Sequence, residues 1–98
     1  MRLVIATPTR ILVERDDVAA LRAEDATGWF GLRPGHADFR TVLEPSVVTW
    51  TDSAGADRYA ALRGGVLTVR GGAEIEIASR EAFVGDDLDR LEAALGDA

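Results

Sequence analysis

Residues 46–63 read SVVTWTDSAGADRYAALR, two β-prone runs joined by a turn, and this stretch decides the fold class. Asp52 can accept hydrogen bonds from the backbone of its own turn, and Gly55 can take the positive φ that a tight reversal needs. The flanking runs, 46–51 and 57–63, are therefore expected to pair as a β-hairpin. A mainly β protein follows if the rest of the chain repeats this pattern.

The pattern does repeat along the chain. Runs rich in Val, Ile, Leu and Thr recur between turn residues about every 8 to 12 positions, the spacing of a β-sandwich or barrel. The strict alternation of Glu74-Ile75-Glu76-Ile77 predicts a strand with one buried side and one solvent-facing side. Besides the hairpin, strands are expected at 2–7, 10–14, 17–23, 39–44, 65–70 and 74–79, with shorter extended pieces at 29–32 and 81–84.

Only the end of the chain has a helical period. Leu88, Leu91 and Leu95 fall on one helix face, an aspartate can cap the start, and Gly96 can end the helix. A helix of about ten residues is marginal alone, so its leucines need a surface to cover, either the strand body or a part that is missing. The predicted organisation is a β body over 1–84 followed by a short helical tail over 85–98.

Composition excludes several classes of function. The chain has 98 residues and no cysteine, so we expect one domain without disulfides or thiolate zinc sites. All eleven basic residues are arginine and the net charge is −6, which opposes binding to nucleic acid. No run approaches about 18 apolar residues, so no direct insertion into a membrane is expected. The strand pattern begins within residues 1–5, which does not fit a signal peptide.

Candidates for chemistry are few. His36 and Asp38 form a His-x-Asp pair that could bind a metal or act as an acid–base couple, but a metal site normally needs three protein ligands. The triplets at 63–65 and 70–72 read Arg-Gly-Gly, and they end regular β runs, which favours turns over RNA-binding repeats. No phosphate-binding glycine motif occurs, so no cofactor is predicted. A docking or structural role for His36 is favoured over catalysis.

Trp29 and Phe30 follow a turn-like stretch, where large aromatic side chains need not belong to the core. An exposed tryptophan usually marks a contact with another molecule. We expect Phe30 to point inward and Trp29 to lie nearer the surface.

These residues also carry a resemblance to a known family. Gly28-Trp29-Phe30-Gly31-Leu32-Arg33-Pro34-Gly35-His36-Ala37 resembles the G-x-[LF]-G-[IVL]-x-P-G-H-A signature of the epsilon subunit of F-type ATP synthases. The opening residues 2–8 look like the first strand of that family, and Arg63-Gly64-Gly65-Val66-Leu67-Thr68-Val69 looks like its [SR]-G-G-x-L-x-V strand. The resemblance runs through Leu95 and so covers nearly the whole chain.

The resemblance implies a fold and partners. The fold is a ten-stranded flattened β-sandwich followed by one short C-terminal helix. The protein would be a non-catalytic subunit of the central stalk that binds the gamma subunit and the c-ring, with a further contact to the alpha and beta subunits through its tail. It would lie at the cytoplasmic face of the cell membrane as a peripheral part of the complex. The implied c-ring contacts are Gly28, Trp29, Phe30 and Gly31, and the implied gamma contacts are Arg33, His36, Asp38 and Phe39.

The sequence departs from the family at Trp29 and in length, since the family usually continues into a hairpin of two helices and this sequence holds only the start of the first helix. Members often have an acidic residue where Trp29 stands, so an ionic contact with the ring would become a stacking or apolar one. The sequences of residues 22–26 and 34–39 resemble the variant epsilon subunits of alternative, sodium-type synthases more than the common form. The sequence leaves open whether the complex transports protons or sodium ions. The family's ATP-binding helix motif has arginine where this chain has Glu92, and a carboxylate there would repel phosphate.

Two rival functions remain at the level of sequence. A generic β-sandwich adaptor for peptides or glycans predicts a groove with several exposed aromatic side chains, although the chain has few aromatics. A small metal hydrolase around His36 and Asp38 predicts bound metal and loss of turnover in His36→Ala.

Overall fold

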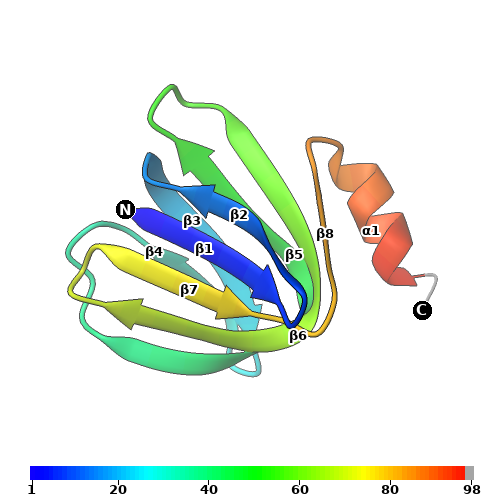
Figure 1. Ribbon diagram of the computed structural model, residues 1–98, viewed down its shortest axis with the longest axis horizontal. Helices are drawn as coiled ribbons and strands as arrows, with labels where there is room; N and C mark the ends of the chain where they lie inside the picture. Colours follow the sequence, from blue (N-terminus) through cyan, green and yellow to red (C-terminus); the bar gives the residue numbers. More distant parts are fainter. Residues whose placement is uncertain (97–98) are drawn as a thin grey trace.

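The computed structural model describes residues 1–96, and over this range the chain forms strands and one short helix (Figure 1). The last two residues of the predicted tail, 97–98, lie outside the described residues. The elements are β1 (Arg2–Thr7), β2 (Arg10–Arg15), β3 (Val18–Asp25), β4 (Gly28–Leu32), β5 (Phe39–Asp52), β6 (Asp57–Arg70), β7 (Glu74–Ala78), β8 (Ala82–Gly85) and α1 (Leu88–Gly96).

The strands form one hydrogen-bonded sheet in the order β2-β1-β7-β6-β5-β3-β4, with β8 paired to β6 off this path. β1 and β7 pair in parallel, and the other pairs are antiparallel. β5 and β6 are long, and two different strands pair with the two halves of β6: β7 with 66–70 and β8 with 59–62. The sheet therefore folds over on itself into two layers, as Figure 1 shows.

The β-sandwich is confirmed, but the ten expected strands are eight, because two pairs of expected strands are continuous. Pairing between β5 and β6 keeps one register on both sides of the predicted breaks, with Leu43 opposite Gly65 and Pro45 opposite Arg63. Gly65 has a φ of +147°, and a β-carbon there would collide with the carbonyl oxygen of Ala78. The glycine thus lets β6 pass close to β7 without ending the strand.

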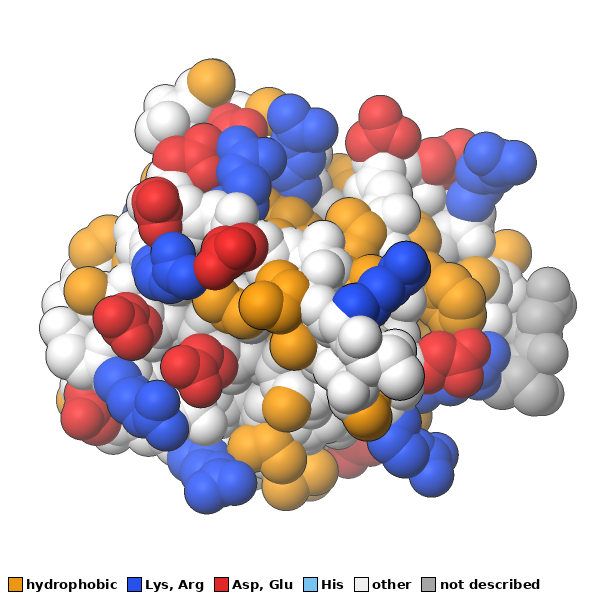
Figure 2. Space-filling model, in the orientation of Figure 1, with side chains coloured by type: hydrophobic (Ala, Val, Ile, Leu, Met, Phe, Trp, Pro, Cys, Tyr) orange, Lys and Arg blue, Asp and Glu red, His pale blue; other side chains and the backbone are white. Residues whose placement is uncertain are grey.

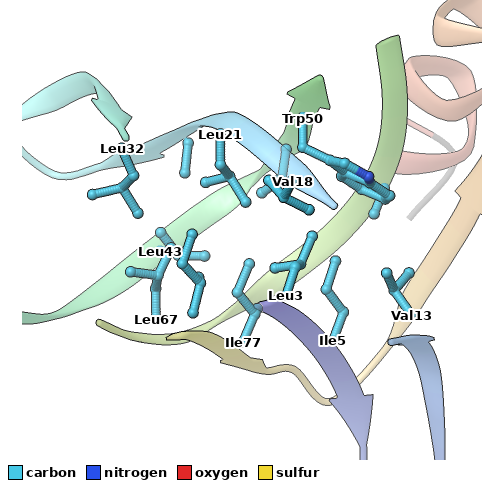
Figure 3. Packing of buried hydrophobic residues seen from close by; sticks show 14 of the residues in the cluster. Leu3, Ile5, Val13, Val18, Leu21, Leu32, Leu43, Trp50, Leu67 and Ile77 are labelled. Atoms are coloured by element: carbon cyan, nitrogen blue, oxygen red, sulfur yellow. The ribbon is translucent and has the colours of Figure 1, made fainter. Parts of the chain in front are cut away.

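The core lies between the two layers (Figure 3). Leu3 and Ile5 of β1 and Ile77 of β7 face Leu21 of β3 and Trp50 of β5, and all five side chains are buried. The glutamates that alternate with the isoleucines of β7 are exposed, as the period-two pattern predicts. Each fully buried aliphatic side chain of this kind contributes roughly 1.5–3 kcal/mol through burial.

The tail helix α1 packs on the outside of the sandwich. Asp87 caps its start, since Oδ1 accepts the N–H of Arg90 at 3.3 Å. Leu91 is 7% exposed and packs with Val47 of β5 and Ala61 of β6, while Leu88 is 37% exposed. The surface that the leucines cover is therefore the strand body. Within residues 1–96, no helix is long and apolar enough to cross a membrane.

Candidate protein-docking site

The β3–β4 hairpin presents the first set of predicted contact residues on a fixed turn. The N–H and the hydroxyl of Thr27 both donate to Oδ1 of Asp25, and the hydroxyl of Thr41 donates to Oδ2 at 2.7 Å. The pKa of Asp25 is held below its usual value by these hydrogen bonds to the charged carboxylate, first that from the Thr27 hydroxyl, then that from the Thr41 hydroxyl, and then that from the Thr27 N–H. Asp25 thereby ties the hairpin tip to β5.

Trp29 and Phe30 divide between surface and interior as the sequence predicts. Trp29 is 51% exposed, and the guanidinium carbon of Arg22 lies 5.0 Å from its ring centroid, within cation–π range. Phe30 is partly buried against the core and meets Phe39 edge to face, with ring centroids 5.6 Å apart. Trp29 thus presents an exposed aromatic ring on the outer face of β4, where a partner molecule could contact it.

The loop 33–38 carries most of the second set and is tied to the β6–β7 turn. The N–H of Gly35 donates to the carbonyl oxygen of Gly72 at 2.8 Å, and the N–H of Gly71 donates to Oδ1 of Asp38 at 2.7 Å. Asp38 therefore has a structural role that the sequence did not suggest. His36 is exposed, and its ring centroid lies 5.2 Å from that of Phe39.

The first predicted contact set covers Gly28 to Gly31 of β4, and the second begins just beyond the other end of that strand. Gly28 begins the strand at the hairpin, and Arg33 follows its last residue, Leu32. With about 3.3 Å per residue, the two ends are roughly 13 Å apart. A partner at the hairpin tip and a partner at the loop would therefore meet opposite ends of β4, although Gly31 of the first set lies close to Arg33 of the second.

The sheet register reveals an exposed apolar row that the sequence analysis missed. Cross-strand pairing links one outward-facing residue on each of five strands: Val42 to Val66, Val66 to Ala78, Ala78 to Ala6, and Ala6 to Ile11. Val42 is 71% and Ile11 is 58% exposed. Figure 2 shows hydrophobic side chains in a band from the middle to the lower edge of this face, with charged side chains beside it. An apolar row on an outer sheet face is typical of a docking surface.

Comparison with known proteins agrees with this fold. Residues 1–85 match the family model described as ATP synthase, Delta/Epsilon chain, beta-sandwich domain. The chain belongs to this ATP synthase delta/epsilon chain family. The resemblance stated from its sequence motifs is confirmed.

Two curated relatives of this delta/epsilon chain are both named ATP synthase epsilon chain 2. The one from Paraburkholderia xenovorans is 46% identical over 95 residues, covering 97% of this chain and 68% of the relative. The one from Cereibacter sphaeroides is 45% identical over 95 residues, covering 97% of this chain and 65% of the relative. The chain thus spans about two thirds of the length of these relatives.

Two solved structures share the fold of this delta/epsilon chain. A chain of the Euglena gracilis mitochondrial ATP synthase, solved as OSCP/F1/c-ring in rotational state 1, superposes with a TM-score of 0.79 at 22% identity. That match covers 97% of this chain and 61% of the other. A chain of the Tetrahymena thermophila mitochondrial ATP synthase central stalk and c-ring gives a TM-score of 0.72 at 17% identity, covering 85% and 65%.

As a delta/epsilon chain, the protein is a non-catalytic subunit of ATP synthase. The geometry at His36 and Asp38 does not resemble a catalytic pair either. Nδ1 of His36 lies 2.7 Å from the carbonyl oxygen of Ala37, and the Asp38 carboxylate is bonded to the backbone of Gly71. Across residues 1–96, no three His, Cys, Asp or Glu side chains gather closely enough to hold a metal ion.

Proposed function

We propose that this chain is a central-stalk subunit that docks on both the gamma subunit and the c-ring and so helps couple ion movement to ATP synthesis or hydrolysis. Its family supports a place in the ATP synthase. The observation that carries the proposal is the apolar row Ile11–Ala6–Ala78–Val66–Val42 on an outer face of the sandwich. Such a row costs free energy when hydrated and is expected to be covered in the assembled complex.

The proposed c-ring contact is the β3–β4 hairpin, with Gly28, Trp29, Phe30 and Gly31. Trp29 supports this role because it is half exposed and stacked with Arg22 on a turn that Asp25 holds in place. A rigid aromatic side chain gains contact area at a low cost in conformational entropy. Phe30 contributes by fixing the strand to the core.

The proposed gamma contact combines the loop 33–38 with the apolar row. Arg33 and His36 offer exposed polar groups. The ring of Phe39 packs against that of His36, and Asp38 holds the loop against the β6–β7 turn. The loop is bonded to the β6–β7 turn, and the row crosses the same two strands at Val66 and Ala78, so we propose that one partner covers both regions. This division gives gamma a broad face and the ring a single hairpin.

Rigidity is the mechanical contribution that we propose for the sandwich. Two layers packed around one core, with β5 and β6 running through both, leave few soft motions between the two contact regions. Torque can then pass between gamma and the ring without slip. In this proposal the chain sits at the cytoplasmic face of the cell membrane, and the exposed side of its docked tail helix contacts the alpha and beta subunits.

The experiment compares one substitution in each proposed contact, and a control substitution outside both contacts. Binding of the purified chain to gamma and to c-ring from the same organism is measured by calorimetry for the wild type, Trp29→Ala, Val42→Glu and Ser53→Glu. Val42→Glu should weaken gamma binding at least about tenfold and spare the ring, and Trp29→Ala should do the reverse. Ser53→Glu adds the same charge at an exposed turn outside both contacts and should change neither. Absence of binding to gamma by the wild type, or an equal loss with Ser53→Glu, would contradict the proposal.

A further inference from the structure

Strand β4 has a free edge. Within the described part of the chain, β4 pairs with β3 on one side and has no strand on the other (Figure 1). Proteins usually protect such edges with charged residues or proline, but Gly28–Leu32 contains neither. At the opposite end of the sheet order, edge strand β2 carries Arg10, Glu14 and Arg15. β4 is therefore the unprotected edge of the two.

The hairpin register shows which backbone groups of β4 face outward. Asp25 pairs with Gly28 across a two-residue turn, and Ala23 pairs with Phe30. In an antiparallel hairpin the pair that closes such a turn exchanges both hydrogen bonds, and bonded pairs then alternate along the ladder. The N–H and C=O groups of Trp29 and Gly31 thus point away from β3, toward the free edge.

We propose that the free edge of β4 pairs antiparallel with β4 of a second copy of this chain. With the twofold axis beside Phe30, Trp29 of each copy lies directly opposite Gly31 of the other. Each such pair brings together the outward N–H and C=O groups of both residues, as a hydrogen-bonded antiparallel pair requires. A one-residue shift of this register would put inward-facing groups opposite outward-facing ones.

The side chains fit the same register. Trp29 and Gly31 are two residues apart, so both lie on the outer face of β4. A β-carbon built on Gly31 meets only the backbone oxygen of Leu21, at 3.9 Å, so the space above this glycine is open. The Trp29 ring of one copy can lie over Gly31 of the other, an arrangement in which an aromatic side chain covers a strand glycine. The pairing is thus self-complementary in backbone and side chains.

The contact is small, since it uses one five-residue strand from each copy. An interface of this size is expected to be weak, so the pair should form in concentrated free protein and dissociate on dilution. The same strand is proposed above to dock on the c-ring, so pairing and docking would exclude each other. The pairing itself does not depend on that proposal.

Hydrogen exchange in the wild type tests the pairing without any substitution. Amide exchange is followed by NMR at low and high protein concentration. The amides of Trp29 and Gly31 should exchange several-fold more slowly at high concentration, while the amide of Phe30, already directed toward β3, should not change. Protection of other amides with Trp29 and Gly31 unchanged would overturn the proposal, as would exchange independent of concentration.

Sedimentation equilibrium provides the second arm. The average mass of the wild type should rise from 10.5 kDa toward twice that value with concentration. Gly31→Pro removes an outward N–H, a change that edge strands tolerate, and Gly31→Lys adds a charge over the same spot. Both variants should stay monomeric. Val84→Ala shortens an exposed apolar side chain on β8, another strand with a free side, and should associate like the wild type. Association that survives in a folded Gly31 variant, or is lost only in Val84→Ala, contradicts the assignment.

Discussion

Gly72 lies so close to Gly35 that a β-carbon on Gly72 would come 2.8 Å from the α-carbon of Gly35. The N–H of Gly35 donates to the carbonyl oxygen of Gly72 at 2.8 Å, so the two backbones are in direct contact. Gly72 also has a φ of +65°, which disfavours any other residue. This contact positions the loop that contains His36.

Replacing Gly72 tests the contact. We expect Gly72→Ala to lower the free energy of unfolding by about 2–4 kcal/mol, from backbone conformation and steric overlap together. Gly71→Ala is the matched control: Gly71 has a φ of +63° and open space around the added carbon. It should cost about 1–2 kcal/mol. Equal losses in urea unfolding of the two variants would show that the approach of Gly35 does not matter.

Asp52 should stabilise the β5–β6 turn strongly. Its side chain is 6% exposed, and Oδ1 accepts the N–H groups of Ala54 and Ala56, each at 3.0 Å. Asp52→Ala leaves both donors without this acceptor and should cost about 2–4 kcal/mol of unfolding free energy. Asp52→Asn keeps an acceptor oxygen and should cost clearly less. Chemical denaturation distinguishes the two, and identical losses would mean that the charge, not the hydrogen bonding, stabilises the turn.

Leu91 should decide whether the tail helix stays docked. A helix as short as α1 is marginal without packing, and Leu91 is its one buried side chain among those described. Leu91→Ala should therefore remove much of the helical circular dichroism while the strand body keeps its cooperative unfolding. Leu88→Ala, at a more exposed position of the same face, should have a smaller effect. Loss of the whole fold in Leu91→Ala would contradict the proposed division into a body over 1–84 and a tail over 85–98.

Asp25 should make the hairpin sensitive to acid. Its pKa is lowered in the folded protein by hydrogen bonds from Thr27 and Thr41, so it contributes stability that is fully present above the unfolded pKa. That stability is lost as the pH falls below about 4 and through the lower, folded pKa. Asp25→Asn should be less stable than the wild type at neutral pH and should lose less stability in acid. Parallel stability curves for the two proteins would contradict this account.

The strand pattern was predictable from sequence because it depends on local alternation and turn residues. The hairpin around Asp52 and Gly55, the alternation in β7 and the cap at Asp87 all formed as expected. The breaks expected near Pro45 and Gly64 were wrong. Their effect depends on pairing with neighbouring strands, which local sequence does not contain.

The candidate site was predictable only in part, for the same reason. The inward Phe30 and outward Trp29 follow from their place after a turn. The hydrogen bond from the N–H of Gly71 to Asp38 joins residues far apart in the chain, so the local sequence does not predict it. The apolar row likewise appears only once the register aligns Val42 with Val66 and their neighbours.

The most direct test of the docking account is hydrogen exchange of this chain, free and within the ATP synthase assembled with gamma and c-ring. The account predicts slower exchange on assembly at 28–31, at 33–39 and along the strands that carry the apolar row, with the exposed turn at Ser53 unchanged. Protection confined to other surfaces, with the β3–β4 hairpin and the His36 loop exchanging as in the free chain, would contradict it.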